Sequence, residues 1–162
     1  MTEALYRGKR TDNGAWIEGW YIFDMVRDIA WIVRAVLNGE NNPEFYYAEV
    51  DPETVAPWSG MSDKDGKRIF RDDILAQIDR RNPKNTRHCI VKYGEFNCSC
   101  CNGVYGWTLD GQCADIRDFE GDMWSPRYKV VGNIHDNPEL IEAWERENLV
   151  PFYTKKIEEA KE

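Results

Sequence analysis

Residues 5–23 read LYRGKR, then TDNG, then AWIEGWYIF, and this stretch decides the fold class. The turn residues Thr11-Asp12-Asn13-Gly14 stand between the run LYRGKR and the aromatic-rich run AWIEGWYIF. An Asn-Gly pair supplies the positive φ angles that a tight turn requires. The stretch therefore predicts a β-hairpin, and it is the strongest local signal in the chain.

Two further β-rich runs follow the hairpin, at Ile29–Val36 and Phe45–Val50. They are separated by Asn38-Gly39-Glu40-Asn41-Asn42-Pro43, whose residue types are typical of turns. Together with the hairpin they predict a small β-meander over residues 1–50.

The region 51–136 is expected to be a small barrel-like or sandwich β unit. Asp51-Pro52-Glu53 can open a short helical turn, and residues 61–68 are expected to form a polar loop. Four short runs after the loop carry the β-branched and aromatic residues typical of strands: Ile74–Ile78, Cys89–Phe96, Gly106–Leu109 and Tyr128–Val131.

A C-terminal helix and tail are expected over residues 137–162. Asn137 is a suitable cap, Pro138 suits the first helical position, and Leu140, Ile141 and Trp144 give one apolar face. The whole chain, residues 1–162, is thus predicted to be a single, mainly β domain.

The composition and the cysteine count indicate in which compartment the protein works. The chain has 162 residues, 42% of them hydrophobic, which argues for a folded core. Its longest apolar stretch is broken by Arg34, and no signal-peptide pattern precedes it, so we expect a cytoplasmic protein with no membrane partner. Five cysteines cannot form a closed disulfide set and are expected to be reduced.

Several stretches are similar to one protein family. They are Tyr6–Arg10, Trp16–Gly19, Val50–Val55, Gly60–Phe70 and the run Val131–Leu140, which reads VGNIHDNPEL. In this order and over most of the chain, they resemble the YopX family of phage and prophage proteins. The resemblance implies a mainly β protein encoded by a phage or an integrated element, with no agreed catalytic residues. Asp72 and Pro57-Trp58-Ser59 depart from the family pattern, where Gly and Gln-Tyr-Thr are common.

Three cysteines within four residues raise the question of a metal site. Cys98 and Cys101 form a Cys-x-x-Cys pair, and Cys113 with Cys89, or with His88, would complete four zinc ligands. A structural zinc site usually has two such pairs, and this chain has one. We therefore expect Cys98, Cys100 and Cys101 to be reduced and metal-free, with zinc kept as the alternative and no cofactor expected.

Other chemistry finds less support. A cysteine nucleophile would need His88 or His135 as its base, and His135 is better explained by the helix start that follows it. Four acids could hold a cation but do not match a calcium loop: Asp115, Asp118, Glu120 and Asp122. We expect no catalytic residues.

Charge is unevenly distributed. The net charge of −8 argues against general binding to phosphate, yet residues 64–92 hold nine Lys and Arg against four acids. The loop 79–88 carries Arg80, Arg81, Lys84 and Arg87, which would contact a nucleic acid. A solvated hairpin tip is the simpler interpretation.

The leading hypothesis is a non-enzymatic binding protein that acts on a host protein or small ligand and antagonises a host defence. The many aromatic residues favour it, because aromatic rings often anchor interfaces. Trp58 is the one binding residue predicted, and an excess of Trp predicts a homo-oligomer. The alternatives are a nucleic-acid-binding protein that uses loop 79–88 and an enzyme with an unrecognised site.

Overall fold

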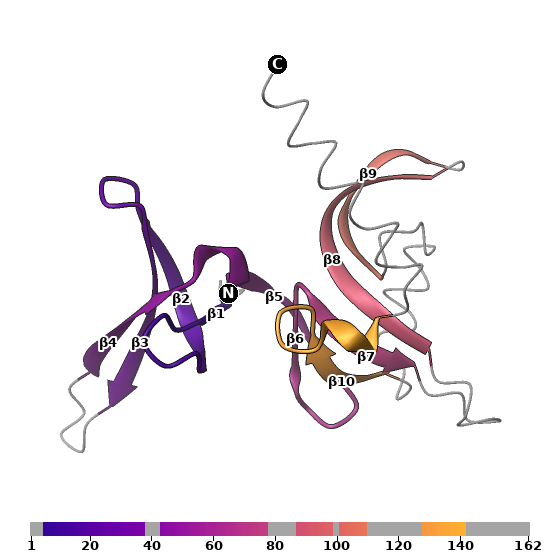
Figure 1. The fold of residues 1–162 in the computed structure, drawn as a ribbon. Coiled ribbons are helices and arrows are strands. Elements are labelled where there is room, and N and C mark those ends of the chain that lie inside the picture. Colours follow the sequence, from indigo (N-terminus) through magenta and orange to yellow (C-terminus); the bar gives the residue numbers. More distant parts are fainter. Residues whose placement is uncertain (1–4, 38–42, 78–86, 99–100, 110–127, 142–162) are drawn as a thin grey trace.

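In a computed structural model, the structure describes residues 5–37, 43–77, 87–98, 101–109 and 128–141 (Figure 1). Within them no helix is long and apolar enough to cross a membrane. The described residues form strands and two single 3-10 turns: β1 Tyr6–Lys9, β2 Trp16–Asp24, β3 Ile29–Leu37, β4 Pro43–Val50, η1 Pro52–Thr54, β5 Ala56–Ser62, β6 Arg68–Phe70, β7 Asp73–Gln77, β8 Arg87–Cys98, β9 Cys101–Leu109, β10 Tyr128–Asn133 and η2 Pro138–Leu140.

The predicted hairpin is confirmed, with a longer connection than a two-residue turn. β1 and β2 are antiparallel, and Lys9 lies opposite Trp16, so six residues connect the strands. Of the Asn-Gly pair only Gly14 has a positive φ, +70°. Asn13 acts through its side chain instead, because its Oδ1 accepts a 2.9 Å hydrogen bond from the Ala15 N–H.

The predicted N-terminal meander is also confirmed, and it curls around its own core. β2 pairs with β3 and β3 with β4, both antiparallel. One face of these strands buries Ala30, Ile32 and Val50. Because the sheet curls, the end of β4 lies beside the end of β1. There Arg10 and Val50 form an isolated β-bridge, and the Thr11 N–H donates to the Glu49 carbonyl at 3.1 Å.

The first sheet runs past residue 50, because β5 and β6 extend it in the order β4-β3-β2-β1-β5-β6. Neither strand was predicted from the sequence. β5 pairs with β1 and β6 with β5, and the expected polar loop over 61–68 is a hairpin connection. Asp63 Oδ1 fixes that connection by accepting 2.9 Å bonds from the N–H groups of Asp65 and Lys67.

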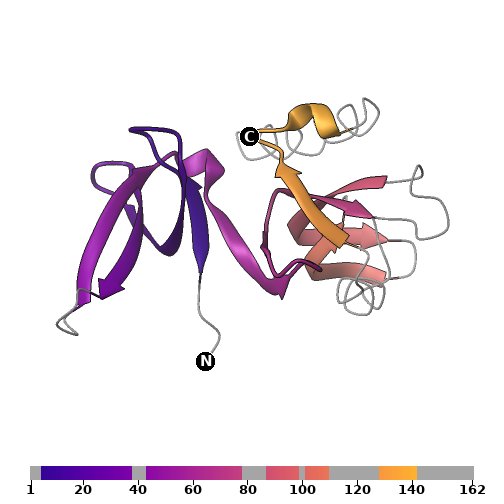
Figure 2. The same ribbon diagram turned by 90° about the horizontal axis from the view of Figure 1, so that it is seen from below.

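The second sheet is antiparallel and has the order β10-β7-β8-β9 (Figure 2). Its core residues are Ile69, Leu75, Cys89, Val91, Leu109, Tyr128 and Val130. The expectation of a mainly β fold is confirmed. The barrel-like form expected for this region is wrong in the described residues, since β9 and β10 lie at opposite edges of the sheet and do not pair.

The expected C-terminal helix is not found in the described residues. Pro138–Leu140 make one 3-10 turn, and Ile141 after it is extended, with ψ 130°. The Asn137 side chain makes no capping hydrogen bond, contrary to the sequence prediction. Because a single turn is a costly nucleus on its own, a residue type suited to capping is not sufficient to propagate a helix. Residues 142–162 lie outside the described residues.

Candidate interaction surface

A buried ion pair lies where the two sheets meet. Arg7 of β1 places its Nη1 2.5 Å from Asp73 Oδ1 of β7, and both side chains are more than nine-tenths buried. The Arg7 guanidinium lies between the rings of Trp16 and Phe70, 4.8 and 4.9 Å from their centroids. Burial raises the pKa of Asp73, and Arg7 opposes that rise. Arg7 therefore ties the two sheets together through charge and through ring contacts.

Asp136, in the turn after β10, forms a second set of contacts between the two sheets. It accepts bonds from Lys9 Nζ at 2.6 Å, from the Trp16 indole N–H at 2.5 Å and from Asn133 Nδ2 at 3.1 Å. These donors, Lys9 first, lower the pKa of Asp136 to about 2. The carboxylate stays ionised at neutral pH with its oxygens engaged, so it is unsuited to act as a general base.

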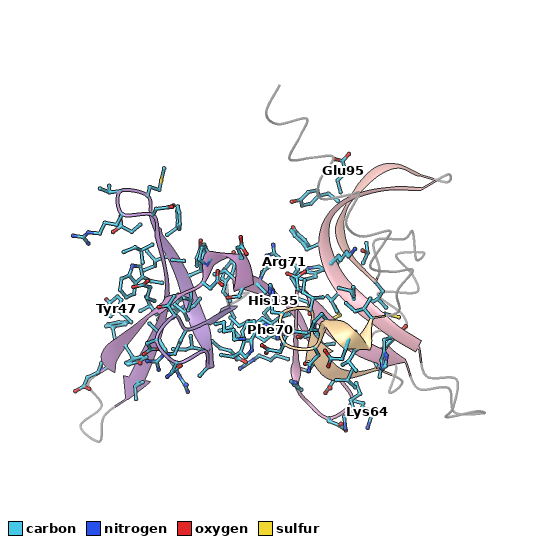
Figure 3. All side chains as sticks on the ribbon, viewed as in Figure 1. Tyr47, Lys64, Phe70, Arg71, Glu95 and His135 are labelled. Carbon is cyan, nitrogen blue, oxygen red and sulfur yellow. The ribbon has the colours of Figure 1, made fainter. Side chains whose placement is uncertain are left out.

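His135 packs beside these contacts, with its ring 6.0 Å from the Trp16 ring (Figure 3). Its Nε2 is buried and has no hydrogen-bond partner among the described residues. The backbone N–H groups of His135 and Asp136 both donate to Asn133 Oδ1 at 3.0 Å. The turn is thus held by Asn133, and the His135 ring serves as packing against Trp16.

Asp72 explains one departure from the family pattern. It has a positive φ of +67°, the left-handed region that favours glycine. Its N–H donates to the Val91 carbonyl at 2.8 Å, and its carbonyl accepts from the Ile134 N–H at 3.0 Å. The turn therefore keeps the backbone conformation that a Gly would adopt, with an Asp in its place.

Trp58, the binding residue predicted from the sequence, is partly buried in β5. Its indole N–H donates to the Met61 carbonyl at 2.8 Å, and the Arg68 guanidinium lies 5.7 Å from its ring centroid. Arg68 in turn pairs with Glu18 at 2.8 Å. These contacts give Trp58 a packing role, and its binding role stays a prediction.

The residues of the alternative nucleic-acid and zinc sites lie largely outside the described residues. Arg80, Arg81 and Lys84 lie outside the described residues, and Arg87 is the first residue of β8. Among the described residues no three His, Cys, Asp or Glu gather as a metal site.

The proposed zinc ligands are spread along the second sheet. Cys98 and Cys101 face each other at the end of the β8–β9 pair, while Cys89 is buried nine residues earlier, about 30 Å of extended chain away. An ion bound by Cys98 and Cys101 would therefore lie far from Cys89. Cys113 and Cys100 lie outside the described residues.

Several exposed apolar side chains lie on the outer face of β2, β3 and β4, around the buried Val33. The strand register places Trp20, Val33 and Tyr47 in one row across the three strands. Ile22 and Trp31 form the next row on one side, and Phe45 follows on the other. We call these six residues the outer apolar face. Trp20 and Ile22 are each 49% exposed, Phe45 54% and Tyr47 58%.

This face is turned away from the second sheet. Figure 3 places Tyr47 on the far side of β2, β3 and β4 from Phe70 of β6 and from His135. The register puts Arg7 and Trp20 on the same face, so this face contacts the second sheet at β1 and exposes Phe45 and Tyr47 at β4. An open apolar face of this kind is suited to contact another molecule.

Sequence reasoning missed this surface, although a signal existed. In an antiparallel strand with one solvated face, apolar and polar residues alternate. Trp20-Tyr21-Ile22-Phe23 and Phe45-Tyr46-Tyr47 are instead continuous apolar runs. A continuous run means that both faces of the strand are apolar, and only one of them can face the core.

Three comparisons with known proteins were made, and one of them shows the family. None of the curated proteins compared matches the chain. Among solved structures, protein EF1440 from Enterococcus faecalis is similar, with a TM-score of 0.55 and 18% identity over 88% of this chain and 100% of that chain. At this identity the likeness concerns the fold alone. The family model described as YopX protein matches residues 5–142, and the chain therefore belongs to the YopX family.

Proposed function

We propose that this protein is a non-enzymatic binding protein, encoded by a phage or prophage, that contacts a host protein through the outer apolar face. The observation that carries the proposal is the exposure of four large apolar side chains in adjacent rows of one sheet face: Trp20, Ile22, Phe45 and Tyr47. In the cell we propose that this binding antagonises a host defence, the role expected from the phage context.

The size of the face favours a protein over a small ligand. A ring of Trp, Tyr or Phe that is half exposed leaves about 100 Å² to bury. The three rings together with the half-exposed Ile22 supply about 400 Å², roughly half of one side of a standard protein interface. The remainder would come from polar residues around them, as in most interfaces, where an apolar centre has a polar rim.

Nucleic-acid binding is the weaker candidate. Its best support is the pair of exposed rings Tyr93 and Tyr105, which meet edge to face at 5.2 Å. Tyr93 lies six residues along β8 from Arg87, about 20 Å of extended strand, which a short single strand of nucleic acid can span. The net charge of −8 is what opposes binding to phosphate. An enzyme with an unrecognised site has no observation in its favour.

Capture from bacterial lysate tests the proposal. Tagged full-length protein is compared with the double variant Trp20→Thr, Tyr47→Thr, in which both replacements keep strand propensity and remove the rings. We expect a host protein enriched by the native chain and reduced at least about tenfold by the double variant. The control variant, with Arg80, Arg81, Lys84 and Arg87 changed to Ala, should capture it fully.

Two results would count against the proposal. Equal capture by the native chain and the double variant would remove the outer apolar face as the site. Salt-sensitive capture of nucleic acid, lost in the basic-loop variant, would favour the nucleic-acid alternative.

Self-association stays a prediction, and light scattering at micromolar concentration measures it.

A further inference from the structure

Three aromatic rings and one carboxylate gather on one face of the β8–β9 hairpin. In the strand register Tyr93 lies opposite Trp107, and Glu95 lies opposite Tyr105. Residues two apart on a strand share a face, so all four side chains lie on the same side of the hairpin. Tyr93 meets the Tyr105 ring edge to face at 5.2 Å and the Trp107 ring at 4.8 Å. We call these four residues the ring–acid cluster.

The ring–acid cluster is open to solvent at its outer end. Tyr93 is 44% exposed and Tyr105 is 68% exposed, and Glu95 is exposed beside them. Figure 3 shows Glu95 on the side of β8 that faces the first sheet. Trp107 packs against the core of the second sheet, and Tyr93 contacts both other rings. The exposed Tyr105 ring is therefore supported by ring contacts and stands next to a carboxylate.

Elsewhere in this protein, a ring beside a carboxylate holds an arginine. Three guanidinium groups each lie within 5.7 Å of a ring centroid and also pair with a carboxylate. They are Arg7 with Trp16, Phe70 and Asp73; Arg10 with Tyr46 and Asp12; and Arg68 with Trp58 and Glu18. The planar guanidinium suits both contacts, because it can stack on a ring face and donate paired hydrogen bonds to a carboxylate.

The ring–acid cluster has the same parts without the arginine. Among the described residues, no guanidinium lies over its rings, and Glu95 makes no ion pair. Lys92 precedes the cluster on β8 but lies opposite Thr108, on the other face of the hairpin. Arg71 lies on the same side of the second sheet (Figure 3), and its Nε is engaged by Asp72 Oδ2 at 3.0 Å. Neither cation therefore pairs with Glu95.

We propose that the ring–acid cluster binds an arginine side chain of a partner protein. The guanidinium would stack on the exposed ring of Tyr105 and donate hydrogen bonds to the Glu95 carboxylate. A lysine ammonium lacks the planar surface and the paired donors. A nucleotide phosphate would be repelled by Glu95 and by the net charge of −8.

The exposure of the cluster also favours a protein segment over a small free cation. Sites for small molecules usually enclose most of the ligand, whereas Tyr105 is 68% exposed. A segment of a partner protein can bury the surrounding surface while its arginine contacts the ring. The site lies on the second sheet and does not depend on the outer apolar face.

NMR titration of the full-length, 15N-labelled protein tests this site. The probe is the capped peptide Gly-Ser-Arg-Ser-Gly, and binding is followed at the backbone amides of Glu95 and Tyr105 and at the Trp107 indole N–H. Comparison peptides carry Lys, or the uncharged analogue citrulline, in place of Arg.

Two variants each remove one part of the cluster. Tyr105→Thr removes the ring and keeps strand propensity, and Glu95→Gln removes the charge and keeps the shape. The matched controls Tyr47→Thr and Glu49→Gln make the same two changes at exposed positions of β4, on the first sheet. Far-UV circular dichroism establishes that each variant folds.

We expect the Arg peptide to bind the native chain in the millimolar range, and Tyr105→Thr and Glu95→Gln each to weaken binding about fivefold. The Lys peptide should bind at least about fivefold more weakly than the Arg peptide, and the citrulline peptide should not shift these signals. Both control variants should bind the Arg peptide as the native chain does.

Several outcomes would overturn the inference. They are an absence of shifts with the Arg peptide, equal binding of the Lys or citrulline peptide, and unchanged binding by Glu95→Gln. Methylguanidinium that binds as tightly as the peptide would indicate a small-cation site, and shifts caused by a short oligothymidylate would indicate a nucleic-acid site; either result overturns the proposal. Lysate capture through the outer apolar face is measured separately, so failure of this test leaves the proposed function standing.

Discussion

Replacing Arg7 with Met should strongly destabilise the fold, because it leaves Asp73 buried without its partner. Asp73 is 1% exposed, and its other oxygen accepts a 2.8 Å bond from the Phe70 N–H. Met is chosen because it keeps most of the side-chain volume between Trp16 and Phe70. Removing one partner of a buried ion pair costs about 3–5 kcal/mol. Arg7 Nε and Asp73 Oδ1 have no hydrogen-bond partner among the described residues. We therefore expect a loss of unfolding free energy at the lower end of this range, about 3 kcal/mol.

Urea unfolding followed by tryptophan fluorescence measures this loss, and thermal unfolding should show a fall in Tm of roughly 6–12 °C. The matched control is Arg68→Met, which breaks the exposed Arg68–Glu18 pair, with side chains 49% and 42% exposed. An exposed pair contributes about 1 kcal/mol or less. Equal losses in the two variants would refute the reasoning that burial decides the cost.

The pH dependence gives a second check on Arg7→Met. Burial raises the pKa of Asp73 in the folded chain, and Arg7 opposes the rise, so the variant should have a still higher pKa at Asp73. A carboxyl whose folded pKa is raised binds protons more readily in the folded state, so stability is gained as the pH falls through that pKa. The difference between variant and native chain should shrink as the pH is lowered from 8 toward 5. A difference that grows would contradict the assignment.

Three further changes have defined outcomes. Asp136→Asn should lower the free energy of unfolding by about 1 kcal/mol at pH 7. Because the pKa of Asp136 is lowered in the folded chain, the native protein should lose this stabilisation as the pH falls from 4 to 2, and the variant should not. Unfolding measured at a series of acid pH values tests both expectations. Gly132→Ala should destabilise by about 1–3 kcal/mol in urea unfolding, because the added Cβ would lie 2.4 Å from Asn137 Oδ1. Asp72→Gly should unfold at higher urea than Asp72→Ala, by about 1 kcal/mol, because only Gly adopts the +67° φ without strain.

Local patterns were sufficient for the N-terminal strands and failed for β5 and β6. β2, β3 and β4 are rich in β-branched and aromatic residues, and turn residues precede β2 and β4. β1, which reads YRGK, is recognised through the Asn-Gly turn that follows it. β5 reads APWSGMS, with a Pro, a Gly of positive φ and a break in register before β6. Its strand conformation depends on two pairings. Pro57 pairs with Tyr6 of β1, about fifty positions earlier, and Trp58 pairs with Phe70 of β6, twelve positions later. Such pairing is not encoded in a local window.

Contacts distant in sequence also explain what was missed at the junction. His135 was explained by a helix start at Asn137-Pro138-Glu139, and no role was predicted for its neighbour Asp136. The Asp136 carboxylate reaches Lys9 and Trp16, more than a hundred residues earlier. Asp73 reads as an ordinary surface acid in Arg71-Asp72-Asp73, and only the fold buries it against Arg7. Sequence patterns identify residue types suited to a role, and the fold decides which partners they meet.

The stretches that carry the family resemblance lie mainly at the joint between the sheets. Tyr6–Arg10 and Trp16–Gly19 supply Arg7, Lys9 and Trp16, and Val131–Leu140 supplies Asp136. Each has a structural partner within hydrogen-bond or ring-contact distance, so the resemblance is accounted for by folding. Trp20, Ile22, Phe45 and Tyr47 fall outside all the resembling stretches and have large exposed areas that packing does not require. Membership of the YopX family therefore accounts for this scaffold. Under the proposed function, the outer face of β2 to β4 selects the partner, because its exposed residues take no part in the joint.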